Sequence, residues 1–270
     1  MSTFEQPDPP PGASRSRLVV GTGEEAREIA VETRAGRDPG LFWLAGFRSD
    51  MFGSKALALD ATGARLGLSV TRFDYSGHGI SGGDFEKGTI SHWLEEAEAA
   101  YGNPQTGRIV IGSSMGGWIA LLLARKKFLA GTPLSGLVLI APAADMTHEL
   151  MLPGFSAPQR ADLATLGHVD RPSAYSDTPY RITRKLIEDG ERHLLFGKPI
   201  ETGCPIVILQ GGQDPDVPQA HAVRLVTHLL HDPVTLTLIP DGDHRLSRAE
   251  DLALLDAAIA RLAGAQLSPA

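Results

Sequence analysis

Short, almost entirely apolar segments alternate with longer segments of helical pattern over most of the chain. The apolar segments are residues 41–45, 68–73, 108–111, 137–140, 205–209 and 234–239, and two shorter ones at 18–20 and 28–32 precede them. Continuous Val, Ile and Leu, rather than a polar residue at every second position, is typical of strands buried on both faces. The helical patterns are residues 54–62, 90–101, 115–129, 220–230 and 248–263. This alternation predicts an α/β fold with a doubly wound, mostly parallel sheet of about eight strands.

One long segment interrupts the alternation. Between residues 145 and 202 the strand patterns stop, and Pro, Gly and charged residues surround short helical fragments such as 180–189. A long insertion without strands is typical of a lid over an active site; a passive surface excursion is the alternative. We therefore expect a core at 18–144 and 203–266, with a small helical lid at 145–202 inserted before the last two strands. A disordered, Pro-rich leader is expected at 1–17.

Charge and hydropathy narrow the classes of partner. The chain of 270 residues has a net charge of −7, and its densest basic spot, residues 125–127, falls near the end of a predicted helix, where cations suit the helix dipole. These features argue against nucleic acid. No apolar segment approaches the roughly 20 residues that span a bilayer, so no stable membrane insertion is expected. The first residues lack the basic-then-apolar order of a secretory signal, and we expect a cytoplasmic protein.

The most specific motif is Gly-x-Ser-x-Gly at residues 112–116, between a predicted strand and an apolar helix. In that context the motif is typical of a sharp, strained turn that projects a nucleophilic serine. Side chains two positions before and after this serine would collide with the neighbouring strand and helix. Centring the motif on Ser113 would place Ile111 and Met115 at those positions. We therefore predict that Ser114 is the nucleophile.

A serine hydroxyl needs a general base, and the base needs an orienting acid. With this type of turn, the acid and then the histidine follow the serine at the ends of later strands. His244 is the one histidine of nine that follows the final predicted strand. Asp214 and Asp216 share the loop after the preceding strand, and Asp145 follows an earlier one. We predict His244 as the base and Asp214 as the acid, with Asp216 and Asp145 as alternatives.

The oxyanion that forms on an attacked carbonyl needs preorganised N–H donors. We expect one from the backbone amide of Met115, directly after the nucleophile. The second is expected from the loop after residues 41–45, where Gly46 lets the chain turn back and Phe47 supplies its amide.

Several other residues could take part in catalysis, metal binding or substrate binding, but their sequence neighbourhoods support such a role less strongly. His78 is expected to be loop structure, with pocket lining as the alternative, and Asp243 is expected to bond loop backbone. His228 and His231 stand one helical turn apart, yet no nearby residue completes a metal site. Cys204 is expected to be a buried thiol. Six apolar residues of the predicted lid are candidates either for an acyl channel or for the lid's own core: Phe155, Leu163, Leu166, Tyr175, Tyr180 and Leu186.

Taken together, these motifs resemble the α/β-hydrolase family of serine hydrolases. The loop at Gly46-Phe47 is similar to the family's His-Gly-x oxyanion loop, although Ala45 stands where many members have His. The resemblance implies that Ser114, Asp214 and His244 fill the matching catalytic roles. Residues 72–77, 112–118, 172–176 and 243–245 are also similar to a subgroup of abhydrolase-domain acyl-protein thioesterases and acyl-glucuronide esterases, with bacterial carboxylesterase relatives.

The expected reaction is hydrolysis of a small acyl ester or thioester through an acyl-enzyme, without a metal or organic cofactor. An acylated protein is a second candidate substrate, and the pattern favours no particular oligomeric state. Amide hydrolysis, C–C bond hydrolysis and a cofactor-free peroxidase reaction are alternatives on the same framework, because fold and function are loosely linked. A non-catalytic binding protein is the remaining alternative.

Overall fold

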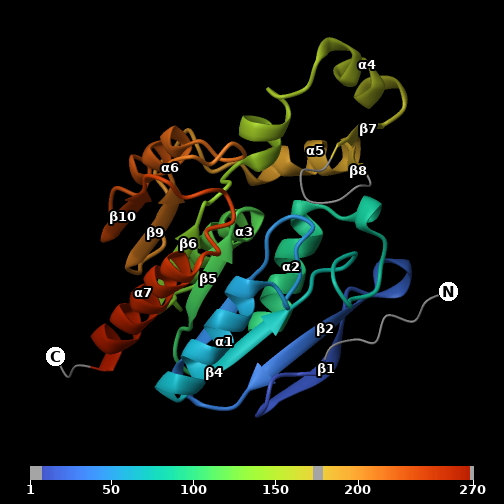
Figure 1. Cartoon of the computed structure of the whole chain (residues 1–270). Helices are drawn as coiled ribbons and strands as arrows, with labels where there is room; N and C mark the ends of the chain where they lie inside the picture. Colours follow the sequence, from blue (N-terminus) through green and yellow to red (C-terminus); the bar gives the residue numbers. More distant parts are fainter. Residues whose placement is uncertain (1–7, 173–178, 268–270) are drawn as a thin grey trace.

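The computed structural model describes residues 8–172 and 179–267, and an eight-stranded sheet forms its centre (Figure 1). The strand order is β1-β2-β4-β3-β5-β6-β9-β10. Strands β1 and β2 and strands β2 and β4 pair antiparallel, and all the other pairs are parallel. The doubly wound, mostly parallel sheet expected from the sequence is therefore confirmed. The strands are β1 Ala13–Val20, β2 Arg27–Arg34, β3 Arg37–Leu44, β4 Leu68–Phe73, β5 Ile109–Ser113, β6 Gly136–Ile140, β9 Ile206–Gly211 and β10 Val234–Ile239.

Helices cover both faces of this sheet. Helix α1 packs beside α7 on one face, and α2 beside α3 on the other (Figure 1). Strands β5, β6 and β9 are buried along their whole length, which explains why their sequences carry no polar alternation. The helices are α1 Ser54–Leu66, α2 Ile90–Tyr101, α3 Met115–Leu129, α6 Gln219–Val226 and α7 Ala249–Leu267. No helix in the described part of the chain is both long and apolar enough to cross a bilayer.

The first two strands are longer than the sequence pattern indicated. Strand β1 pairs with β2 over eight residues, from Ala13 opposite Arg34 to Val20 opposite Arg27. The leader expected at 1–17 therefore overlaps an edge strand; residues 1–7 lie outside the described residues. The first residues of β1 are polar and therefore show no apolar pattern from which to predict a strand. One of them, Arg15, instead forms an ion pair with the buried Glu32 of β2.

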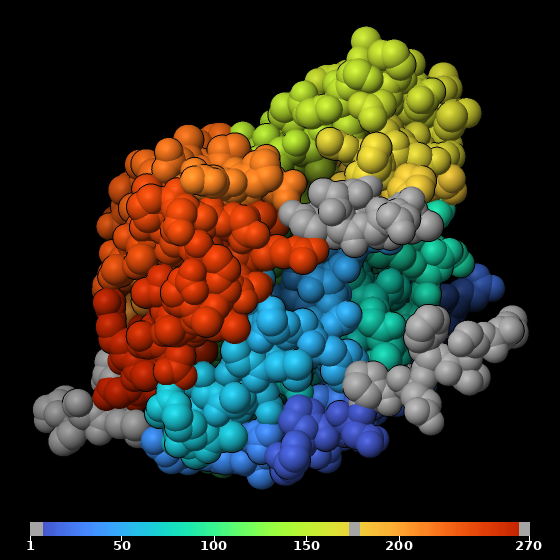
Figure 2. All heavy atoms as spheres, viewed as in Figure 1, coloured from blue at the N-terminus to red at the C-terminus, as the bar shows by residue number. Residues whose placement is uncertain are grey.

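The insertion between β6 and β9 contains strands, contrary to expectation. Strands β7 (His168–Arg171) and β8 (Tyr180–Thr183) form an antiparallel pair, and Arg181 bonds Asp170 across it. Charged residues on strands of four residues gave no apolar pattern from which to predict them. Its helical segments are η3 Thr147–Met151, α4 Ala157–Thr165, α5 Arg184–Gly190 and η4 Glu191–His193, and the insertion projects at the top of the molecule in Figure 2.

Candidate active site

Ser114 lies on the one-residue turn between β5 and α3. Its backbone has φ 54° and ψ −118°, a conformation that costs an L-residue free energy. Neighbouring backbone holds it there: the Ser114 amide donates to the Ile140 carbonyl at 2.9 Å, and the Ser114 carbonyl accepts from Ala143 at 3.1 Å. The strain is thus maintained by β6 and the loop that follows it.

Glycines are required on both sides of this turn. A Cβ added at Gly112 would lie 2.3 Å from the Gly116 carbonyl oxygen, and one at Gly116 would lie 2.1 Å from the Leu44 carbonyl oxygen. Both obstacles are backbone atoms, which cannot move aside as a flexible side chain could. Strands β3 and β5 and helix α3 therefore meet at van der Waals distance around the serine.

Gly116→Ala is expected to lower the free energy of unfolding by at least about 3 kcal/mol, because the methyl group overlaps the backbone of β3. Urea denaturation followed by circular dichroism would measure this change. The matched control is Gly264→Ala in α7, where nothing lies within 4 Å of the added Cβ. That change should be neutral or stabilise by about 0.5–1 kcal/mol. Equal stability of the two variants would contradict the packing argument.

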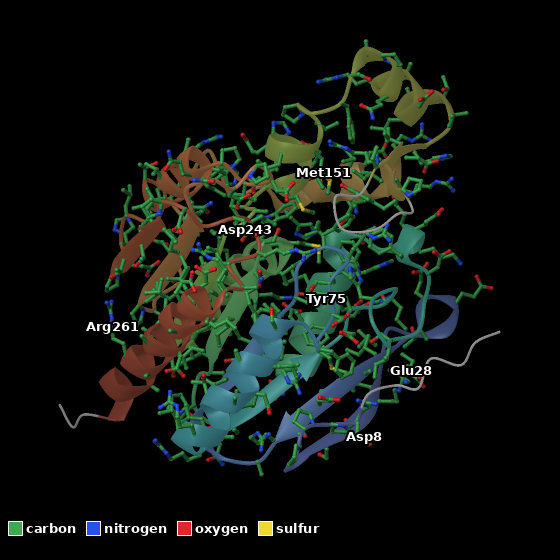
Figure 3. All side chains as sticks on the ribbon, viewed as in Figure 1. Asp8, Glu28, Tyr75, Met151, Asp243 and Arg261 are labelled. Carbon is green, nitrogen blue, oxygen red and sulfur yellow. The ribbon has the colours of Figure 1, made fainter. Side chains whose placement is uncertain are left out.

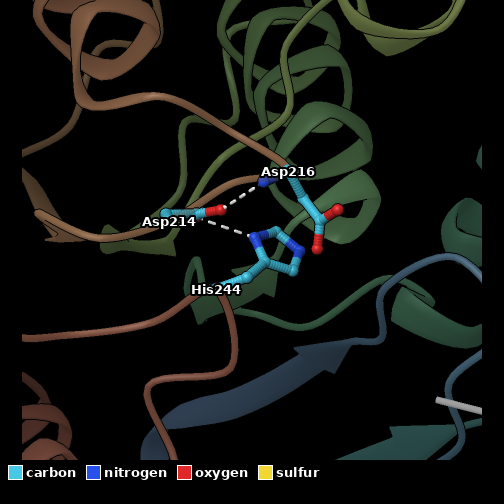
Figure 4. A group of neighbouring side chains, drawn as sticks. All are labelled: Asp214, Asp216 and His244. Carbon is cyan, nitrogen blue, oxygen red and sulfur yellow. Dashed lines mark hydrogen bonds and ion pairs between the residues drawn. The ribbon is translucent and has the colours of Figure 1, made fainter. Parts of the chain in front are cut away.

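The structure brings Asp214, His244 and Ser114 into one chain of hydrogen bonds. His244 Nε2 is 3.1 Å from Ser114 Oγ, and His244 Nδ1 is 2.8 Å from Asp214 Oδ2. The Asp214 side chain is fully buried, and its Oδ1 accepts the backbone N–H groups of Asp216 and Val217 (Figure 4). Three residues separated by 30 to 130 positions in the sequence thus meet at the carboxyl ends of β5, β9 and β10.

The loops that carry the acid and the histidine are joined to each other and to α1. The Gln213 amide donates to the Gly242 carbonyl at 2.9 Å. Asp243 Oδ1 accepts the Leu246 amide at 2.9 Å, the backbone bond expected from the sequence. Lys55 of α1 donates to the Arg245 carbonyl, and burial lowers the Lys55 pKa to about 8. Lys55 could not be identified from the sequence, because its partner is a backbone carbonyl nearly two hundred residues away.

The alternative acids occupy other positions. Asp145 is buried, and its two carboxylate oxygens accept the amides of Leu195 and Phe196, each at 2.8 Å. The exposed Asp216 has an oxygen within 4.8 Å of Asp214 and His244, a spacing that a cation could bridge. Asp214 and His244 already satisfy each other, so this group does not resemble a vacant metal site.

His78 is buried in an aromatic cluster rather than placed at the nucleophile. Its ring packs against Tyr75, Phe85 and Trp93, and burial lowers its pKa to about 4. Its Nδ1 is 3.1 Å from the Ser76 carbonyl oxygen. His78 therefore packs within its loop, as expected from the sequence. It also lines a second cavity, beside Arg48 and Tyr180, which matches the alternative of pocket lining. The buried position expected for Cys204 is confirmed.

The loop after β3 passes directly beside the nucleophile. A Cβ added at Gly46 would lie 3.4 Å from Ser114 Cβ. Within residues 8–172 and 179–267, the amides of Phe47 and Met115 donate no hydrogen bond to another residue. Two N–H groups without protein acceptors beside a serine form an arrangement that could receive a developing oxyanion.

A cavity of about 770 Å³ opens over Ser114 and His244, between the sheet and the insertion. Met151, which lines this cavity, is labelled on the insertion in Figure 3, and Asp243, which directly precedes His244, is labelled below it. Of the apolar residues proposed for an acyl channel, Tyr180 lines the cavity, Leu166 is exposed, and Tyr175 lies outside the described residues. Phe155, Leu163 and Leu186 are buried but do not line it. The apolar wall is formed instead by Trp43, Ala143, Met146, Leu150, Met151 and Val217.

Comparison with known proteins identifies relatives that all belong to one family of hydrolases. The model of the "Alpha/beta hydrolase family" matches residues 38–258. The proteins named Palmitoyl-protein thioesterase ABHD10, mitochondrial, from Bos taurus and Homo sapiens are each 32% identical, covering 84% of this chain and 74% of each relative. The resemblance inferred from the motifs is confirmed.

Solved structures give the same result. A candidate hydrolase from Agrobacterium vitis S4 is 48% identical, with a TM-score of 0.90 over 93% of this chain and 99% of that one. Mouse alpha/beta hydrolase domain-containing protein 10 is 28% identical, with a TM-score of 0.81 over 94% of this chain and 100% of that one. The similarity to both therefore includes the insertion as well as the sheet.

The expectation of a cytoplasmic protein is wrong by this comparison. The curated relatives from Bos taurus, Mus musculus and Homo sapiens are named as mitochondrial proteins. Cellular addresses are read by receptors from short segments, independently of how a domain folds. The lack of a secretory pattern in the first residues, and the charge and hydropathy of the rest, therefore could not establish the location of the protein.

Proposed function

This chain belongs to the alpha/beta hydrolase family, and from that membership we propose that it cleaves carboxylic esters or acyl thioesters through an acyl-enzyme on Ser114. One observation carries the proposal: the hydrogen-bonded chain from Asp214 through His244 to Ser114. This chain is the arrangement that acyl transfer by a serine requires.

In the first half of the reaction, neutral His244 takes the Ser114 proton as Oγ attacks the acyl carbonyl, across the present 3.1 Å separation. Buried Asp214 orients the ring and stabilises the imidazolium. The amides of Phe47 and Met115 stabilise the oxyanion. His244 then protonates the departing alcohol or thiol.

In the second half, His244 deprotonates a water that attacks the acyl-enzyme, and the same two amides stabilise the second oxyanion. Collapse of that intermediate releases the carboxylic acid and returns the proton to Ser114. Every step uses residues of this chain alone.

The proposed acyl group lies against the apolar wall of the cavity, and the leaving group points toward the entrance. Met146, Leu150 and Met151 come from the insertion, so residues 145–202 would act as a lid that sets the acyl preference, on a core formed by 18–144 and 203–266. The curated relatives are named palmitoyl-protein thioesterases, which favours acyl thioesters, including acylated proteins, among the candidate substrates.

A matched series of p-nitrophenyl esters and acyl thioesters tests the proposal. Each methylene that enters the apolar wall should raise kcat/KM up to about fourfold, until the wall is filled. Met151→Gln should flatten this increase, whereas Leu166→Asn, on the exposed surface of the insertion, should leave it unchanged. A rate that does not depend on chain length would contradict the acyl assignment, and a wild-type protein that no fluorophosphonate labels would contradict the serine mechanism itself.

A further inference from the structure

The buried carboxylate of Asp74 is hydrogen-bonded to the end of the loop that carries Phe47. The proposed reaction makes no direct use of this carboxylate. Asp74 follows β4 and is 0% exposed. Its Oδ1 accepts the Met51 amide at 2.7 Å, and its Oδ2 accepts the Ile80 amide at 2.9 Å. One side chain thus joins the loop after β3 to the loop after β4.

The segment 46–51 is fixed at both ends. At its start, Gly46 lies against Ser114, and the Ser49 amide donates to the Gly46 carbonyl at 3.0 Å. At its end, Asp74 holds the Met51 amide while Arg72 donates to the Met51 carbonyl. The Phe47 amide lies between these two attachments.

The surroundings of Asp74 leave little room for another arrangement. A Cβ at Gly79 would lie 2.0 Å from Asp74 Oδ2, so that position accepts only glycine while the carboxylate is in place. Burial raises the Asp74 pKa to about 6, partly offset by the two amide donors, and the charges that face it are Asp50, Glu32 and Arg72. An ionised carboxylate here costs free energy of desolvation, and its two oxygens can accept both backbone N–H groups at once, which a neutral amide cannot do.

We propose that Asp74 is a positioning residue, which holds the loop 46–51 so that the Phe47 amide points at the oxyanion. The proposal rests on the proposed acyl transfer at Ser114. Because the oxyanion exists only during reaction, loss of Asp74 should weaken binding of the transition state more than binding of the substrate.

Asp74→Asn tests this, since the amide keeps the shape but can accept only one of the two N–H groups. We expect kcat to fall about 10- to 100-fold with KM changed less than about threefold. A trifluoromethyl ketone, which forms an oxyanion on the serine, should lose affinity by the same factor. Asp145→Asn is the matched control: it is equally buried and also accepts two backbone amides, but on residues 195–196, and its kcat should remain near wild type.

A second measurement covers the case in which Asp74→Asn does not fold. In ¹H–¹⁵N spectra of the His244→Ala protein, the Met51, Ile80 and Phe47 amides should shift together with a midpoint near pH 6, the Asp74 pKa. A Phe47 amide that stays unchanged while Met51 and Ile80 shift would overturn the proposal. So would an Asp74→Asn enzyme with normal kcat and inhibitor affinity, while inactivity of wild-type protein toward every acyl substrate would instead overturn the proposed function.

Discussion

Ser114→Ala is expected to lower kcat for p-nitrophenyl acetate by about 10⁵- to 10⁶-fold. The change deletes the hydroxyl oxygen that lies 3.1 Å from His244 Nε2, so no acyl-enzyme can form on this residue. The residual rate would come from stabilisation of the oxyanion by the amides of Phe47 and Met115. Steady-state kinetics at neutral pH, with the background hydrolysis subtracted, would measure the effect.

The fold should survive this substitution, because alanine removes one half-buried hydroxyl that faces the cavity and the backbone hydrogen bonds of Ser114 remain. Ser113→Ala is the matched control on the neighbouring residue, which belongs to β5, and it should retain most of the activity. Unchanged turnover in Ser114→Ala, or a loss in Ser113→Ala as large as that in Ser114→Ala, would rule out Ser114 as the nucleophile.

The second large effect is expected from Asp214→Asn. An amide at this position would donate where the carboxylate accepts, which favours the wrong tautomer of His244 and leaves the imidazolium without a counter-charge. We expect kcat to fall by about 10⁴-fold with little change in KM. The same ester assay would measure it.

Asp216→Asn supplies a control from the same loop. Its side chain is exposed, and its backbone N–H donates to Asp214 Oδ1. We expect a change of less than about tenfold, since the buried acid would remain in place. If instead Asp216→Asn caused the larger loss, the roles of the two carboxylates would have to be exchanged.

The fold could be predicted where packing imposes a pattern. Strands buried on both faces are mostly apolar, so the apolar stretches of β3, β5, β6 and β9 could be identified directly from their composition. The first half of β1 and the pair β7 and β8 could not, because their residues are largely polar and the strands are stabilised by their pairing partners, such as Glu32 for Arg15. Their existence depends on tertiary contacts that no local pattern contains.

In the candidate site, too, some residues could be predicted from the sequence and others could not. Ser114, Asp214 and His244 could be proposed from sequence because each follows a recognisable strand in a fixed chain order. Asp74, Lys55 and the cavity wall at Met146 and Met151 could not, because their partners are backbone groups or lie in the insertion. Gly79 could not point to Asp74 either, because its positive φ of 48° in the loop already explains a glycine there.

The carboxylate of Asp145 has a consequence for how such chains can diversify. It fastens the first residue of the excursion after β6 to residues 195–196 near its far end, so the chain leaves and re-enters the domain at almost the same point. A segment with neighbouring ends can be lengthened, shortened or exchanged without changing the span that its host must bridge. The proposed lid could therefore be exchanged as one module, which would change the substrate range while the proposed catalytic residues keep their geometry.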